Sequence, residues 1–180
     1  MKVLVACEFS GRVREAFRRK GHDAWSCDLE PTEIPGNHIQ QDVRCVLSDG
    51  WDLLIGHPPC TYLAASGARW WKVREREQAE AIRFVETLWN CNVPRVALEN
   101  PVGILSRVLG MPSQIFQPWH LGAPFNKRTC LWLKGLPRLT GQSYGFADNE
   151  VRYHGQSKDR QKNRSRTYEE VAEAMARCWG

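Results

Sequence analysis

No apolar run in the sequence approaches the length of about twenty residues that a membrane-spanning helix needs. No pair of its seven cysteines has Cys-x-x-Cys spacing, so neither a zinc site nor a disulfide framework is supported, and we expect a reducing cytosol. Internal repeats and low-complexity tracts are also missing. What remains is a chain of 180 residues with a hydrophobic share of 42% and eight tryptophans. This composition indicates one globular domain over residues 1–180.

Glycine is scarce in the turn after the first apolar segment, because this turn contains only Gly11. Residues 2–7 read as a buried strand and residues 12–20 as a helix. A strand, a turn of small residues and a helix open many nucleotide-binding α/β units, in which the helix N-terminus faces the cofactor. With one glycine the motif is weak, because many α/β proteins begin in this way without a cofactor. The candidate contacts are Phe9, Ser10 and Gly11.

Two aspartates follow at the ends of the next two predicted strands. Asp28 ends the strand over residues 23–28, where an acidic side chain can accept hydrogen bonds from ribose hydroxyls. Asp42 lies near the end of a short strand over residues 39–43. The alternative for either carboxylate is a helix cap or a solvated turn. Together with the first turn, the two aspartates favour a cofactor site.

The most distinctive stretch is a short apolar strand, residues 52–55, that enters the sequence Gly-His-Pro-Pro-Cys and ends on Cys60. Pro58 and Pro59 lack amide donors and fix φ, so they hold Cys60 in one direction at the carboxyl end of the strand. Ligands of open α/β sheets bind at that edge. The alternative is a structural cysteine, since free cysteines are usually buried hydrophobic residues.

A second apolar strand, residues 95–99, ends on Glu99 and Asn100 before a proline. If the two strands are parallel neighbours, Glu99 lies close to Cys60. A thiol beside a carboxyl group is a plausible catalytic pair, because one group can attack while the other, protonated, holds the substrate.

Pro59-Cys60 followed by Leu98-Glu99-Asn100 resembles the cytosine carbon-5 DNA methyltransferase family, which carries a Pro-Cys nucleophile motif and a Glu-Asn motif in this order. The amino-directed DNA methyltransferases end the same loop in Pro-Pro-Tyr, Phe or Trp, which makes them the least favoured alternative. The resemblance implies an α/β fold with a mostly parallel, doubly wound, Rossmann-like sheet, and S-adenosylmethionine as cofactor. It covers nearly the whole chain apart from a target-recognition domain.

The resemblance also implies the roles of the candidate residues. Cys60 is the nucleophile at carbon 6 of cytosine, and a protonated Glu99 supports ring nitrogen 3. Burial at an apolar strand end favours that protonation. Asp42 binds the adenine amine of the cofactor. The full set of implied cofactor contacts is Phe9, Ser10, Gly11, Asp28, Asp42 and Pro58.

A polar and basic cluster before the apolar strand around Leu131 resembles a further family motif, usually Gln-x-Arg-x-Arg. Asn126 and Arg128 match its first two positions, whereas Cys130 stands where the second arginine would be. The family pattern is therefore incomplete here. Arg128 is the third catalytic candidate, as a residue that holds the base or a phosphate.

Basic and aromatic residues indicate a nucleic-acid partner. The loop after Cys60 carries Arg69, Trp70 and Trp71, a cation for phosphate and two rings for stacking. Anchoring of the following helix is the alternative for the two tryptophans. Residues 134–163 are a reduced loop with a basic arm, in the place of a target-recognition domain. The arm grips the nucleic-acid backbone or is a solvated surface; its residues are Lys158, Arg160, Lys162 and Arg164, and Asn126 is a further nucleic-acid candidate.

The sequence therefore predicts a compact DNA cytosine carbon-5 methyltransferase of the bacterial cytosol, with no metal. Its partner is duplex DNA with the target base flipped out, which the net charge of +5 supports mildly. A second copy of the chain is a further candidate partner, and a phage origin follows from the resemblance alone. The alternatives are the same chemistry on RNA or a free cytosine nucleotide, and a catalytically inactive nucleic-acid-binding protein of this fold.

Overall fold

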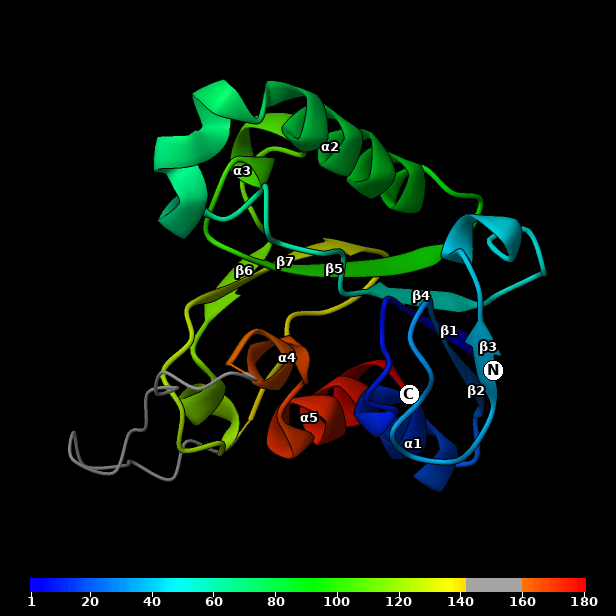
Figure 1. The fold of residues 1–180 in the computed structure, drawn as a ribbon. Helices are drawn as coiled ribbons and strands as arrows, with labels where there is room; N and C mark the ends of the chain where they lie inside the picture. The colour runs from blue at the N-terminus through cyan, green and yellow to red at the C-terminus, as the bar shows by residue number, and fades with distance from the viewer. Residues whose placement is uncertain (142–159) are drawn as a thin grey trace.

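The computed structural model describes residues 1–141 and 160–180, and within them one seven-stranded sheet has the order β3-β2-β1-β4-β5-β7-β6 (Figure 1). The strands are β1 (Lys2–Ala6), β2 (Asp23–Asp28), β3 (His38–Gln40), β4 (Leu53–Gly56), β5 (Arg95–Pro101), β6 (Gln114–Phe116) and β7 (Thr129–Lys134). The α-helices are α1 (Arg12–Arg19), α2 (Glu75–Trp89), α3 (Leu105–Val108), α4 (Arg160–Ser165) and α5 (Glu169–Trp179). Three 3₁₀ helices are η1 (Val43–Cys45), η2 (Ala65–Val73) and η3 (Pro118–Leu121).

The first five strands run parallel, and β7 is antiparallel to both of its neighbours, β5 and β6. From the central strand β1 the chain builds outward to β2 and β3, and then returns to the other side of β1 with β4. The direction of winding therefore reverses between β1 and β4, and ligands of doubly wound sheets bind at such a switch point. The predicted fold class, a mostly parallel doubly wound sheet, is confirmed.

Helices cover both faces of the sheet, with α1 and α5 on one face and α2 and α3 on the other (Figure 1). Because side chains alternate along a strand, β1 contributes Val3 and Val5 to the core beneath α1 and α5, and Leu4 and Ala6 to the core beneath α2. All four side chains are fully buried. Burial on both faces explains why the central strands are continuous apolar runs.

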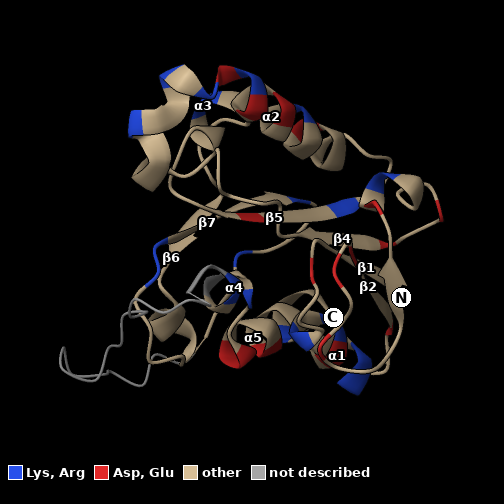
Figure 2. Ribbon diagram, in the orientation of Figure 1, with Lys and Arg blue, Asp and Glu red and all other residues tan. Residues whose placement is uncertain are grey.

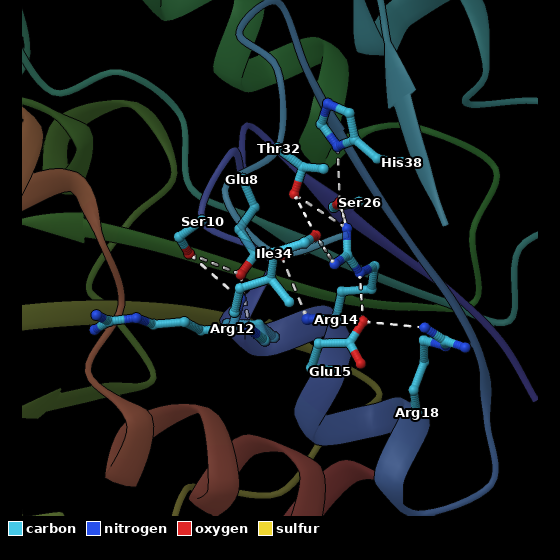
Figure 3. A network of polar contacts seen from close by, with 11 residues as sticks. Glu8, Ser10, Arg12, Arg14, Glu15, Arg18, Ser26, Thr32, Ile34 and His38 are labelled. Carbon is cyan, nitrogen blue, oxygen red and sulfur yellow. Dashed lines mark hydrogen bonds and ion pairs between the residues drawn. The ribbon is translucent and has the colours of Figure 1, made fainter. Parts of the chain in front are cut away.

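A buried arginine fixes the connection between β2 and β3 (Figure 3). Arg14 on α1 is fully buried and donates from Nη1 to Ser26 Oγ at 2.9 Å and from Nη2 to the carbonyl of Ile34 at 2.5 Å. Its Nε donates to Glu15 at 2.8 Å. Gly11 lies against the same guanidinium, because a Cβ there would approach Nη2 to 2.7 Å. The start of α1, the strand β2 and the loop after it are therefore one hydrogen-bonded unit.

The segment predicted as a reduced loop, residues 134–163, is more structured at its ends than the sequence indicates. Lys134 belongs to β7, and residues 160–165 form α4. Basic residues at every second position form one strip only in an extended chain, so the helix removes the basis for a single strip over residues 160–165. Lys158 lies outside the described residues. In the described parts of the chain, no helix is long and apolar enough to cross a membrane.

Candidate active site

Chemically active residues lie at one edge of the sheet, where β1, β2, β4 and β5 end. Parallel strands bring their carboxyl ends to the same edge. The turn after β1, Asp28 at the end of β2, the loop after β4 and Glu99 near the end of β5 therefore share that edge. Figure 2 shows acidic positions on β5 and around the end of β1, and basic positions on α4 and on the chain leading into β7.

Direct hydrogen bonds join the two motifs that the sequence singled out. Asn100 is only 2% exposed, and its Nδ2 donates to the carbonyl of Pro58 at 2.8 Å. Glu99 on the neighbouring strand is bonded to His57, with Nδ1 at 3.0 Å from Oε2. Cys60 follows the double proline and is exposed. The predicted neighbourhood of β4 and β5 is confirmed, and His57 is a member of it that the sequence did not single out.

The turn after Cys60 is held against the connection from β5 to α3. The carbonyl of Cys60 accepts the N–H groups of Leu63 and Ala64, at 3.0 and 2.9 Å. The carbonyl of Leu63 accepts the N–H of Ile104 at 2.9 Å. A Cβ on Gly103 would lie 1.9 Å from that same carbonyl, so only glycine permits this approach. Cys60 therefore begins a turn that is hydrogen-bonded to the segment following β5.

The aromatic and basic residues after this turn lie on η2. Trp70 is 50% exposed, with the guanidinium of Arg69 at 5.2 Å from its ring centroid. Trp71 is partly buried and lines a hollow together with Tyr62 and Arg74, and the Arg74 guanidinium lies 5.8 Å from the Tyr62 ring. Exposed stacking surfaces and cations are therefore gathered next to the Cys60 turn. Their contact with nucleic acid stays a prediction.

Two partners hold the carboxyl group of Glu99 as an ion. Its burial raises the pKa, but the ammonium group of Lys127, with Nζ 3.7 Å from Oε1, and the hydrogen bond from His57 outweigh burial and lower the pKa to about 2. The sequence predicts a protonated Glu99 because it shows only the apolar strand and not these partners. In the chain by itself, with no ligand bound, Glu99 is a carboxylate.

We expect Glu99 to titrate near pH 2, well below its ordinary value of 4.5. The lowered pKa means that ionisation stabilises the folded state, a contribution that is complete above pH 4.5 and lost as the pH falls through 2. Carbon NMR of glutamate-labelled protein, with Glu99→Gln to assign the signal, measures the titration. The difference in unfolding free energy between wild type and Glu99→Gln should narrow below pH 4.5. A Glu99 signal that titrates at 4.5 or higher contradicts the ion-pair assignment.

The basic cluster before β7 reaches Glu99 through Lys127, and the catalytic role of Arg128 stays a prediction. Lys127 reaches Glu99, whereas the catalytic candidate Arg128 is exposed at the edge of β7. Asn126 is partly buried, and Cys130 is buried within β7 opposite Asn100. The antiparallel pairing of β5 with β7 is what carries Lys127 to Glu99. The sequence showed the cluster Asn126-Lys127-Arg128, but it did not show which of the three side chains reaches Glu99.

The turn after β1 is organised by a buried acid that the sequence analysis missed. Glu8 accepts the N–H groups of Val13 at 2.7 Å and of Arg14 at 3.3 Å, and the hydroxyl of Ser10 at 3.2 Å. Its burial raises its pKa, against the opposing effect of His57 and of these hydrogen bonds. The helix N–H groups expected to face a cofactor are thus bonded to Glu8. An acidic residue just before a helix start is the signal that could have indicated this.

Both predicted cofactor aspartates lie near this turn. Burial raises the pKa of Cys7, and the charges of Asp28 and Asp42 raise it further, so both carboxylates are close enough to act on the end of β1. Asp28 accepts the N–H of Glu30 at 3.0 Å. Asp42 caps η1 and forms an ion pair with Arg44, which is the alternative that the sequence left open for it. A cofactor contact by Asp42 would be an addition to that pairing.

The chain before α5 lies over the first turn. Phe9 is buried, with Lys162 Nζ at 5.2 Å and the Arg166 guanidinium at 5.8 Å from its ring centroid. Arg166 also forms a double hydrogen bond to Glu33, at 2.7 and 2.6 Å, and Lys162 lies 3.7 Å from the same carboxylate. Lys162 therefore contributes to an intramolecular contact. The positions predicted with it, Arg160 and Arg164, belong to α4.

No family model matches the sequence, and no curated protein matches it. Solved structures do. One is a protein assigned as a DNA modification methyltransferase, encoded within a prophage of E. coli, with a TM-score of 0.54 and 15% identity over 82% of this chain and 56% of that one. Another is the Entamoeba histolytica methyltransferase EhMeth, with a TM-score of 0.54 and 12% identity over 82% of this chain and 57% of that one. The chain thus spans little more than half the length of either. At these identities the likeness shows the architecture alone: the chain shares the Rossmann-like, doubly wound fold of these two structures.

Proposed function

We propose that the chain transfers a methyl group from S-adenosylmethionine to carbon 5 of cytosine in DNA. The observation that carries the proposal is the buried hydrogen bond from Asn100 to the carbonyl of Pro58. It joins the Pro-Cys loop directly to the Glu-Asn strand end, at the sheet edge where methyl transfer would take place. A cysteine and a glutamate on unrelated parts of the molecule would not support this chemistry.

Cytosine carbon 5 is a poor nucleophile until a group adds at carbon 6. The Cys60 thiolate would form the bond to carbon 6, and the electron pair of the ring double bond would move to carbon 5. S-adenosylmethionine, when bound, supplies the methyl group as an electrophile. Loss of the proton from carbon 5 and elimination of the Cys60 thiolate would then restore the ring.

Glu99 would act on the opposite edge of the ring as a carboxylate. Its oxygens would accept a hydrogen bond from the exocyclic amine and another from ring nitrogen 3, which would take its proton from water as sulfur adds. A carboxylate at this position favours the protonated base, because opposite charges at short range stabilise each other. The proton is then carried by the base, and Glu99 does not have to supply it.

The residues at the end of β1 fit the cofactor chemically. Asp28 and Asp42 can accept hydrogen bonds from the hydroxyl and amine groups of a nucleoside. The charges of both raise the pKa of Cys7 in the turn after β1. Gly11 adopts a φ of +74°, which disfavours any residue with a side chain at this position. Pro58 places its loop at the neighbouring strand end. These residues, with Asp42 in its pairing with Arg44, would hold S-adenosylmethionine.

Duplex DNA is the partner we propose. The Arg69 and Trp70 pair offers a cation and a half-exposed ring beside the Cys60 turn, where a flipped base would enter. The overall charge of +5 supports a polyanionic partner, and a second copy of the chain would extend the contact. A bacterial cytosol, with a phage as the source, is the setting proposed.

Transfer of labelled methyl from S-adenosylmethionine tests the function, with duplex DNA, single strands, RNA and dCMP as parallel substrates. We expect label on cytosine carbon 5 of duplex DNA. Label found only on RNA or only on dCMP would support the proposed mechanism but would show that DNA is not the substrate. If no substrate is labelled while the cofactor still binds, the enzyme proposal fails, and a nucleic-acid-binding protein of this fold replaces it.

A further inference from the structure

His57 is fixed by three neighbouring strands at the centre of the site. It follows β4 directly, its N–H donates to the carbonyl of Ala6 on β1 at 2.9 Å, and its Nδ1 lies 3.0 Å from Oε2 of Glu99 on β5. The side chain is 7% exposed and that of Glu99 is 15% exposed. A histidine held in this way has little freedom to turn its ring.

The second ring nitrogen shows that His57 is more than a satisfied core residue. Nε2 is buried and has no hydrogen-bond partner among the described residues. Buried polar atoms in folded proteins are nearly always bonded, and an exception calls for a reason. The geometry at the other nitrogen offers a reason. Because Nδ1 faces the carboxylate of Glu99, Nδ1 is the nitrogen that carries the hydrogen, and its hydrogen bond to Glu99 sets the orientation of the ring.

Charged groups lie near the ring and near its partner Glu99. Glu8 on the turn after β1 is close enough for its pKa to respond to His57, Glu99 lies on β5, and Lys127 precedes β7. The two oxygens of Glu99 therefore have unequal partners. Oε2 has the short bond to a rigid ring, and Oε1 has Lys127 at 3.7 Å on a long flexible stem. An entering base can replace Lys127 far more easily than His57.

We propose that His57 is a positioning residue for the methyl transfer: its Nδ1–H group holds Oε2 of Glu99, which turns Oε1 and the outer lone pairs of the carboxylate toward the base. This inference rests on the proposed function for its catalytic meaning. The bond between His57 and Glu99 can be tested without it.

Two substitutions separate the Nδ1 hydrogen bond from the bulk of the ring. His57→Phe keeps a ring but removes the donor, whereas His57→Asn places an amide N–H near the position of Nδ1. We expect the phenylalanine variant to lower kcat by about 100-fold, the effect of a misplaced catalytic group, with the KM for DNA within about threefold. It should also raise the pKa of Glu99, since one of the two partners that lower it is gone. The asparagine variant should recover most of both effects.

His120→Phe is the matched control, because His120 is an exposed histidine on η3, and it should keep both the rate and the titration of Glu99. Thermal unfolding confirms that each variant is folded, and the asparagine variant provides the test if the phenylalanine variant is not. Equal loss of kcat in both variants with an unchanged Glu99 titration would overturn the positioning role, as would full activity of His57→Phe. A wild type that transfers no methyl group overturns the proposed function instead, and the Glu99 titration in the free chain still decides on His57.

Discussion

Replacing Cys60 by alanine should abolish methyl transfer, with a loss of at least about 10³-fold, as for other enzymes that lose their nucleophile. No other thiol follows the double proline, and the reaction cannot begin without addition at carbon 6. Because Cys60 is exposed, its side chain contributes little to packing, and a surface substitution typically changes stability by less than about 0.5 kcal/mol. Transfer of labelled methyl and equilibrium binding of S-adenosylmethionine, measured on the same preparation, separate chemistry from cofactor binding.

Cys45→Ala is the matched control for this experiment. Cys45 is also an exposed cysteine, but it ends η1 and lies away from the Pro-Cys loop in sequence. We expect it to keep full activity, which would show that general thiol chemistry is not being measured. A Cys60→Ala protein that still methylates cytosine would refute the nucleophile assignment and leave the fold without its proposed reaction.

Replacing Arg14 by methionine should lower the free energy of unfolding by about 3 kcal/mol or more, the usual cost of removing one member of a buried charged network. The change leaves the hydroxyl of Ser26 and the carbonyl of Ile34 without the donor that each now has in Arg14 (Figure 3). Methionine fills much of the same space, so the loss reports the hydrogen bonds more than a cavity. Urea unfolding followed by tryptophan fluorescence measures the difference.

Arg18→Met on the same helix provides the comparison. Arg18 is exposed and pairs with Glu15 at 3.2 Å, and a surface ion pair of this kind contributes about 0.5 kcal/mol or less. Equal stability losses in the two variants would show that the burial of Arg14 has no special weight. A large loss confined to Arg14→Met would show that the β2–β3 connection is held by this network.

Local sequence patterns determined much of the fold. The apolar runs of β1, β4 and β5 have the length of buried strands, and the helix predicted over residues 12–20 corresponds to α1, Arg12–Arg19. Such patterns are local, because side-chain direction repeats every two residues in a strand and every 3.6 in a helix. The polar helix α4 was missed for the same reason, since it has no apolar periodicity to indicate it.

The residues of the candidate site also divide into those that local sequence patterns identify and those that they do not. Cys60, Glu99 and Asp28 were visible as polar residues that end apolar strands, which is a local feature. His57 and Lys127 were not identified, because their importance depends on contacts with Glu99 on β5, which is far away in the sequence. Glu8 was missed although its contacts with the start of α1 are local.

The sequence by itself determined the central strands β1, β2, β4 and β5, the helix α1, and which polar residues follow these strands. Only the tertiary structure decided the charge of Glu99. Burial alone would keep this carboxyl protonated, but the parallel pairing of β4 with β5 brings His57 to one oxygen, and the antiparallel pairing of β7 with β5 brings Lys127 to the other. A pKa is set by the distances to neighbouring charges, and those distances exist only once the strands have paired.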